Sequence, residues 1–126
     1  MGDWSKEPWG NDEAADWYHK FWKQSDFTFL INEIKNFSPE EERYDSIRAA
    51  CYILQTIGIT HVWPTRHHDI LKELLNKSIT ILENMINPPN ETWGFLDMWG
   101  NDPGVTEAVE SQIKILKIRL NDLHTE

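Results

Sequence analysis

The chain has 126 residues, of which 40% are apolar, and its 21 acidic and 12 basic side chains leave a formal net charge of −9. The apolar content excludes a disordered chain, and the length fits a single domain over residues 1–126, which would bury roughly two-thirds of the surface exposed by the unfolded chain. The negative charge repels phosphate groups, so we expect neither nucleic acid nor a membrane surface as a partner.

The first predicted helix begins at Asn11 or Asp12, because either side chain can accept a hydrogen bond from a free N–H group of the first helical turn. Its apolar residues share one wide face: Ala14, Trp17, Tyr18, Phe21 and Trp22. A second, short helix is predicted over residues 27–37, where apolar residues recur at three- and four-residue spacing. The first part of that segment, residues 27–31, also fits a strand.

The clearest helix-start signal is the segment Ser38-Pro39-Glu40-Glu41. Ser at the cap, Pro at the first helical position and Glu41 at the third predict a capping box. The three acids Glu40 to Glu42 are interpreted as part of this start, where they suit the helix dipole. This third helix is expected to run through Cys51 and to stop near Gly58, a natural terminator.

A fourth helix is predicted from a cap at Thr65 to the residues before Pro88-Pro89. Residues 87–101 are expected to form a long ordered loop, because a flexible tether would not carry so many aromatic side chains. The last helix is predicted from Asp102-Pro103 or from Thr106. The expected fold is therefore all-α, a compact antiparallel bundle of four or five helices with a long aromatic loop before the last helix.

The tetrapeptide Trp-Gly-Asn-Asp occurs twice, at residues 9–12 and 99–102, each time before a predicted helix. Gly allows an unusual turn, Asn or Asp supplies a side-chain acceptor for the first helical turn, and Trp can pack back on the helix. We interpret both copies as helix caps. A repeat this short, with no similarity around it, does not indicate duplicated domains.

The segments Met1-Gly2-x-Trp4 and Pro8-Trp9-x-Asn11-Asp12-x-Ala14-x-Asp16-Trp17 resemble the opening of a small uncharacterised bacterial family. That family begins with Gly-x-Trp-Gly, then an aromatic residue, then Asn-Asp-x-Ala-x-Asp-Trp. Ser5, Trp9 and Gly10 depart from the commoner Gly, Phe and Asp of the family. The resemblance covers residues 1–17 only. It implies a helical bacterial protein without an established activity, and some members resemble immunity proteins that neutralise toxins.

Four residues are candidates for metal or acid–base chemistry: His61, His67, His68 and Asp69. A metal-dependent hydrolase that uses them is one alternative function. However, adjacent histidines on a helix point about 100° apart, and neither a His-Glu-x-x-His pattern nor a cysteine pair is present. The chain also has no glycine-rich phosphate loop and no Gly-x-Ser-x-Gly elbow. We therefore expect no enzyme activity, no metal and no cofactor.

The compartment expected for the chain is the cytoplasm. Cys51 is the single cysteine and lies in an apolar helical stretch, so we interpret it as a packing residue in a reducing environment. The N-terminal segment lacks a signal-peptide pattern, and no apolar run approaches the roughly 20 residues that a membrane span requires.

Acidic and aromatic residues coincide near the predicted loop, and residues 78–113 contain no Lys or Arg. Such a surface attracts a basic protein, and interface centres favour aromatic residues and Met within a charged rim. The partner-binding residues expected on this ground are Glu91, Trp93, Phe95, Asp97 and Asp102. The competing interpretation is that the aromatic residues fill the end of the bundle. Burial is expected for Trp17, Trp22 and Trp99, and is left open for Trp63 and Trp93.

The sequence thus favours a non-catalytic protein-binding protein of the immunity or antitoxin kind, which neutralises a cognate toxin through an acidic, aromatic surface. An oligomeric structural or regulatory subunit is the other alternative.

Overall fold

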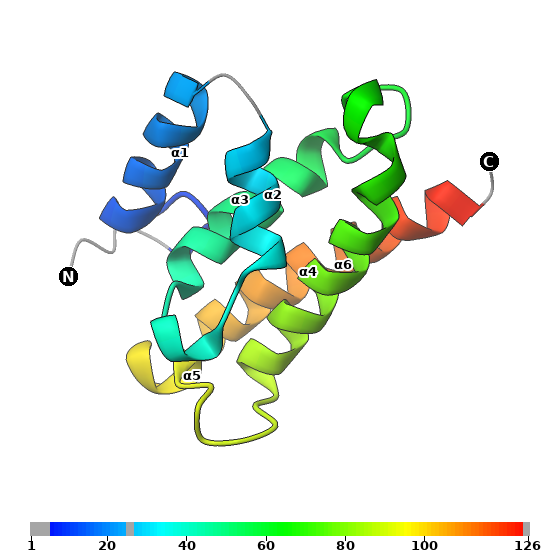
Figure 1. Ribbon diagram of the computed structural model, residues 1–126. Coiled ribbons are helices and arrows are strands. Elements are labelled where there is room, and N and C mark those ends of the chain that lie inside the picture. Colours follow the sequence, from blue (N-terminus) through cyan, green and yellow to red (C-terminus); the bar gives the residue numbers. More distant parts are fainter. Residues whose placement is uncertain (1–5, 25–26, 125–126) are drawn as a thin grey trace.

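The computed structural model describes residues 6–24 and 27–124, and the side chains of all of these except 22–24 and 124. These residues form six α-helices and two short 3₁₀ helices, with no strand among them (Figure 1). The predicted all-α bundle is confirmed, and residues 27–31 do not form the alternative strand. Within the described residues, no helix is long and apolar enough to cross a membrane.

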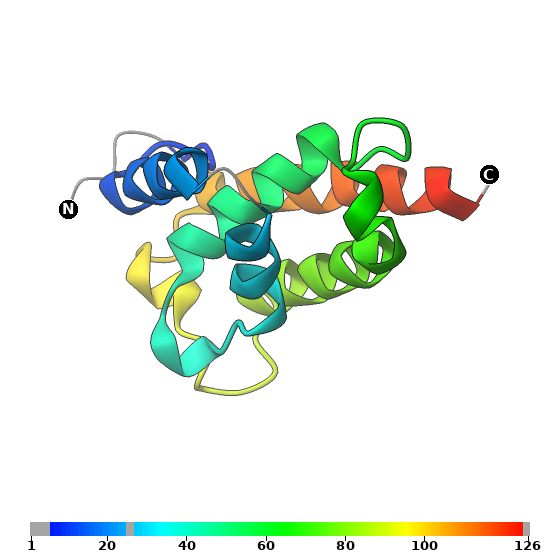
Figure 2. The same cartoon turned by 45° about the horizontal axis from the view of Figure 1, so that its top comes forward.

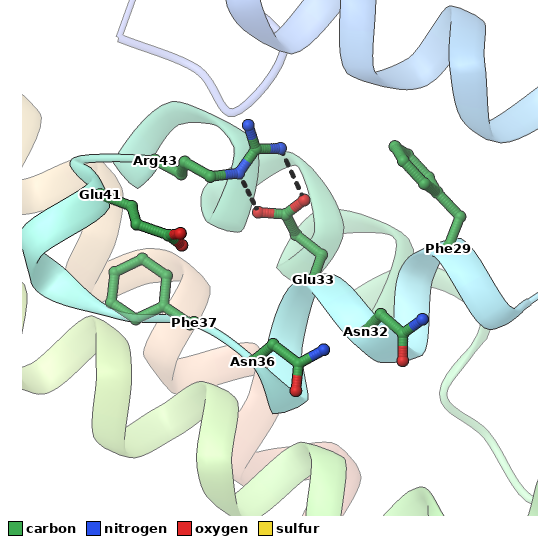
Figure 3. A pocket seen from close by; sticks show the side chains of 7 residues that line it. All are labelled: Phe29, Asn32, Glu33, Asn36, Phe37, Glu41 and Arg43. Atoms are coloured by element: carbon green, nitrogen blue, oxygen red, sulfur yellow. Dashed lines mark hydrogen bonds and ion pairs between the residues drawn. The ribbon is translucent and has the colours of Figure 1, made fainter.

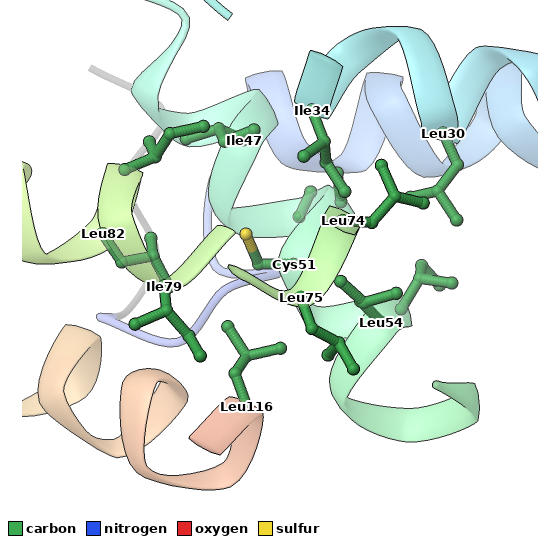
Figure 4. Packing of buried hydrophobic residues seen from close by; sticks show 14 of the residues in the cluster. Leu30, Ile34, Ile47, Cys51, Leu54, Leu74, Leu75, Ile79, Leu82 and Leu116 are labelled. Carbon is green, nitrogen blue, oxygen red and sulfur yellow. The ribbon is translucent and has the colours of Figure 1, made fainter. Parts of the chain in front are cut away.

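Helix α3 (Tyr44–Ile57) is the centre of the bundle. It packs against α1 (Asp12–Gln24), α2 (Thr28–Lys35), α4 (Leu71–Ile86) and α6 (Pro103–His124). A helix covered on several sides must be apolar on several sides, and α3 accordingly buries Ile47, Cys51 and Leu54 completely. Figure 4 shows Cys51 facing the leucine and isoleucine side chains of α4. Helices α4 and α6 lie side by side and run in opposite directions (Figure 2).

Both Trp-Gly-Asn-Asp segments cap a helix, as predicted. The Ala14 N–H donates to Asn11 Oδ1 at 2.8 Å at the start of α1. The Gly104 N–H donates to Asp102 Oδ1 at 2.8 Å at the start of α6. In the second segment the chain reverses through two left-handed residues, Gly100 at φ 61° and Asn101 at φ 56°. Of these two, only Gly adopts such a φ without steric cost.

The start of α3 differs from the prediction. Residues Pro39–Glu41 form the 3₁₀ helix η1, and α3 itself begins only at Tyr44. Glu42 lies between them in the left-handed region, at φ 55°, which ends the helical path. Ser38 caps nothing, because its Oγ donates to Glu40 Oε1 at 2.8 Å instead. The predicted capping box is therefore wrong.

A carboxylate from another helix caps α3. Glu13 Oε2 of α1 accepts hydrogen bonds from the Ser46 N–H at 2.6 Å and from Ser46 Oγ at 2.8 Å. Ser46 is the third residue of α3, so its N–H group has no partner within the helix. The negative carboxylate also suits the positive end of the helix dipole. The start of α3 is thus determined by tertiary packing.

The start of α4 is also later than predicted. Thr65 begins the 3₁₀ helix η2 (Thr65–Ile70) without making a side-chain cap, and α4 begins at Leu71. His67 within η2 has non-helical backbone angles. Trp63 explains this interruption, because its buried indole Nε1 donates to the His67 carbonyl at 2.9 Å. The acceptor is thus the carbonyl of His67, the residue whose backbone angles are non-helical.

The loop over residues 87–101 contains one more short helix, α5 (Phe95–Met98). Of the tryptophans, Trp17 and Trp63 are buried, each 2% exposed. Trp93 and Trp99 are half-buried and pack against the core. The side chain of Trp22 lies outside the described residues, and so do residues 1–5, which include the Gly2 and Trp4 of the family signature.

Candidate functional site

Tyr44 joins two segments that are far apart in the sequence. Its hydroxyl accepts a hydrogen bond from the Gly94 N–H at 3.1 Å. The same hydroxyl can donate to the Pro39 carbonyl at 3.2 Å or to the Thr92 carbonyl at 3.4 Å. Because η1 and residues 92–94 meet at one hydroxyl group, the two segments lie side by side at one end of the bundle.

Aromatic rings fill this end of the bundle. The Phe37 ring lies 5.8 Å from the Tyr44 ring and 5.7 Å from the Trp93 ring. Phe95 lies 5.6 Å from Tyr44 and 6.5 Å from Trp99. Each of these rings contacts its neighbours at distances typical of favourable aromatic pairs. Packing at the end of the bundle therefore accounts for much of the aromatic content of the loop.

Exposed acidic side chains lie on the two segments that carry this aromatic cluster. Helix α5 lies beside η1, at the lower left of Figure 1. We call the exposed surface formed here the acidic end; it comprises Glu40, Glu41, Glu42, Glu91 and Asp97 with Trp93 and Met98. Met98 is 52% exposed and lies next to Asp97 in the chain, so it adds apolar area to this surface.

Four of the five predicted partner-binding residues remain on the surface, and the structure gives them different roles. Glu91 and Asp97 are exposed, and Trp93 is half-buried against Phe37. Asp102 caps α6 and pairs with Lys6 Nζ at 3.5 Å, so its carboxylate already has two partners.

The prediction that Phe95 binds a partner is wrong. Its side chain is 0% exposed and belongs to the core, so it cannot touch a partner in this conformation. Burial is the physical reason, because a large aromatic side chain gains more from the closed core beside Tyr44 than from water.

Sequence reasoning missed the contribution of Glu40, Glu41 and Glu42 to this surface. The three acids were assigned to the first turn of the third helix, whereas they lie exposed in and after η1. No pattern in a single sequence links them to Glu91. Their position depends on the Tyr44 hydroxyl, which brings the two segments together.

A cavity of about 280 Å³ lies next to the acidic end, between α2 and η1 (Figure 3). Glu33 on its wall accepts two hydrogen bonds from Arg43, from Nε at 3.0 Å and from Nη2 at 2.8 Å, and a third from Trp17 Nε1 at 3.1 Å. The hydrogen bond to Glu33 raises the pKa of Arg43. The residues that line the cavity are Phe29, Asn32, Glu33, Asn36, Phe37, Glu41 and Arg43.

A second cavity, of about 240 Å³, lies on the other side of Arg43. It shares Phe29 and Arg43 with the first cavity and is otherwise lined by α1 and by Ser46. Its carboxylates are Glu13, which caps α3, and Asp16. Lys20 offsets part of this negative charge, so this cavity is less suited to a cation than the first one.

The histidines do not come together in the structure. His61 and His68 are exposed, as is Asp69, and the half-buried His67 stacks on Phe27 with the two rings 6.2 Å apart. Among the residues that the structure describes, no group of three or more His, Cys, Asp or Glu side chains is placed to hold a metal ion.

Two buried titratable residues have structural roles. Burial raises the pKa of the Cys51 thiol to about 12, so the thiol stays protonated near neutral pH. Burial lowers the pKa of Arg48, which is 1% exposed. Arg48 Nε donates to Gln112 Oε1 at 2.8 Å, and Nη2 donates to the Lys6 carbonyl at 2.9 Å. Arg48 therefore ties the segment before α1 to the centre of the bundle.

No protein-family model, curated protein or solved structure matches the chain. The candidate site therefore rests on the geometry of the acidic end and of the cavity beside it.

Proposed function

We propose that this protein is a non-catalytic binding protein whose acidic end holds a basic partner protein. The observation that carries the proposal is that the Tyr44 hydroxyl joins Pro39 and Thr92, and so brings the segment with Glu40 to Glu42 beside the segment with Glu91 and the half-buried Trp93. Together the two segments carry five exposed acidic side chains: Glu40, Glu41, Glu42, Glu91 and Asp97.

The arrangement suits recognition of a protein better than it suits chemistry. Exposed carboxylates attract a basic surface and speed its encounter, most strongly at low salt. Trp93 and Met98 offer apolar area that a partner can cover, and binding energy in interfaces concentrates on such side chains. Trp93 already packs against the Phe37 and Tyr44 rings, so less side-chain entropy is lost when a partner covers it.

The kind of partner follows from the resemblance of residues 1–17 to a family with immunity-like members. We propose an immunity or antitoxin protein of the bacterial cytoplasm. Its partner is a toxin that binds an anionic substrate through a basic surface. The acidic end covers that surface, and this inhibition requires no cofactor and no catalytic residue.

The experiment is capture of a partner by the purified protein, followed by affinity measurements with charge-reversal variants. A lysate of the source organism supplies the candidates, and mass spectrometry identifies the protein that is bound at low salt and released at high salt. The test variant carries Glu91→Lys and Asp97→Lys, both exposed and outside the helix caps. We expect its affinity to fall by about tenfold or more, because close charge pairs across an interface are worth more than 1.4 kcal/mol.

A matched control carries the same change of charge in η2 and in the first turn of α4, as Asp69→Lys and Glu73→Lys, both also exposed and outside the acidic end. Glu73 pairs with Lys35 Nζ, at 3.9 Å, on the surface. We expect its affinity to stay within about twofold at moderate salt. If both variants lost the same affinity for the partner, the loss would result from the change in net charge alone. That outcome would contradict a localised acidic interface.

A further inference from the structure

We propose that the cavity between α2 and η1 receives an arginine side chain of the basic partner, an inference that rests on the proposed function. The occupant proposed is one side chain of the partner, because the cavity of about 280 Å³ is at the lower end of ligand sites and adjoins the surface that the partner would cover.

The charged side chains that line the cavity are two carboxylates and one guanidinium group, so one further cation would balance their charge. Glu33 and Arg43 are joined by two hydrogen bonds and neutralise each other, and Trp17 holds the same carboxylate from behind. Arg43 also attracts Glu41, but one positive charge against two carboxylates leaves the lining with a net negative charge. In Figure 3 the Glu41 carboxylate lies beside the Phe37 ring and points toward the middle of the cavity.

The aromatic walls favour arginine over other cations. Phe37 and Phe29 stand at opposite ends of the cavity, and Asn32 lies between them on α2 (Figure 3). A guanidinium group is planar, so it can lie over an aromatic face while its N–H groups donate to a carboxylate and to an amide oxygen. Its apolar stem covers the remaining ring surface.

The cavity is continuous with the acidic end. Phe37 lines the cavity and also packs against Trp93, with the two rings 5.7 Å apart. Glu41 lines the cavity and belongs to η1, which the Tyr44 hydroxyl holds beside residues 92–94. A partner that covers Trp93 therefore has the cavity within reach of a neighbouring arginine, which would act as its anchor.

The first test uses a probe that needs no knowledge of the partner. We would titrate N-acetyl-L-arginine amide into the 15N-labelled protein and follow the backbone amide signals by NMR. Saturable shifts are expected at Asn32, Phe37 and Glu41, with a dissociation constant in roughly the millimolar range. N-acetyl-L-citrulline amide has a similar shape without the charge and should produce no saturable shift. Absence of saturable shifts with arginine amide, or equal shifts with citrulline amide, would overturn the proposal.

The second test compares two adjacent carboxylates. Glu41→Gln removes the charge that faces the cavity, and we expect it to weaken binding of arginine amide by about three- to fivefold, the effect of one partly exposed ion pair. Glu40→Gln removes the same charge from a residue that does not line the cavity and that accepts a hydrogen bond from Ser38. It should leave the affinity unchanged, and equal weakening by both variants would count against the cavity.

The same measurements separate this inference from the proposed function. The Glu91→Lys, Asp97→Lys variant leaves the cavity lining intact and should still bind arginine amide. If arginine amide failed to bind while a basic partner was captured through Glu91 and Asp97, the anchor would be wrong and the binding function would stand. If arginine amide bound but no basic partner was captured, the proposed function would be wrong.

Discussion

The two Trp-Gly-Asn-Asp segments begin helices with different cap residues, although their sequences are identical. In the first segment Asn11, the third residue, caps α1, and in the second segment Asp102, the fourth residue, caps α6. Asn11 is 3% exposed, whereas Asp102 stays partly exposed and also pairs with Lys6. The same four residues therefore produce a buried neutral cap at one helix and a charged surface cap at the other.

The residue that follows each segment explains the shift. Pro103 follows the second segment, and the ring of a proline disfavours helical backbone angles at the preceding residue. Asp102 is therefore kept out of the helix and becomes its cap, with Pro103 at the first helical position, where its missing N–H costs nothing. Glu13 follows the first segment and has no such effect, so Asp12 enters the helix and Asn11 is the cap.

The start of α3 belongs in the same comparison. The clearest helix-start signal in the sequence lies just before it, yet no neighbouring side chain caps the helix. Ser38 and Glu41 have the residue types of a capping box, yet α3 begins at Tyr44 and receives Glu13 from α1. A local cap can be read from neighbouring residues, whereas a cap supplied by another helix cannot. Stability measurements can test each member of this comparison.

The largest effect is expected from removal of the buried cap. Asn11→Ala should lower the free energy of unfolding by about 2 kcal/mol, the upper end of the range for helix caps, because the Ala14 N–H would be left in a buried site. Asp102→Ala should cost about 1 kcal/mol, because water can reach the freed Gly104 N–H. Urea unfolding followed by circular dichroism measures both values. Asn11→Asp, which keeps an acceptor, serves as the control, and equal losses at the two positions would remove the distinction between the caps.

The next effect concerns the cap that α1 supplies to α3. Glu13→Ala should destabilise the protein by about 1.5 kcal/mol, because it removes the charged acceptor of two hydrogen bonds that Ser46 donates. Asp12→Ala removes an adjacent acid from the same turn of α1 and should cost only about 0.5 kcal/mol, through the helix dipole. A double-mutant cycle with Ser46→Ala isolates the contact, and a coupling energy near zero would show that Glu13 does not cap α3.

The smallest effect is expected at Ser38. Ser38→Ala should change the free energy of unfolding by less than about 0.5 kcal/mol, because its hydroxyl bonds only the exposed Glu40 carboxylate. A working capping box would instead cost about 1 kcal/mol. The same urea experiment decides between the two values, and a loss of the larger size would restore the box that the sequence suggested.

The fold was largely predictable, and the candidate site was predictable only in part. Apolar residues at helical spacing marked the helices correctly, because that spacing places them on one face that must be buried. Glu91 and Asp97 were identified by charge and are exposed. Phe95 was misassigned, because composition does not distinguish an aromatic residue at an interface from one in the core. Glu41 and the cavity beside Phe37 were missed, because they depend on how η1 packs against α2.

The sequence by itself indicated every helix except α5, together with the apolar faces, and it limited the starts of α1 and α6 to two candidates each. Each of these features depends on residues within a few positions of one another. Only the tertiary structure decided where α3 begins, since its cap is Glu13 of another helix, whose contact with Ser46 no local pattern contains. The tertiary structure also assembled the acidic end, because one buried hydroxyl, that of Tyr44, holds two distant acidic segments together.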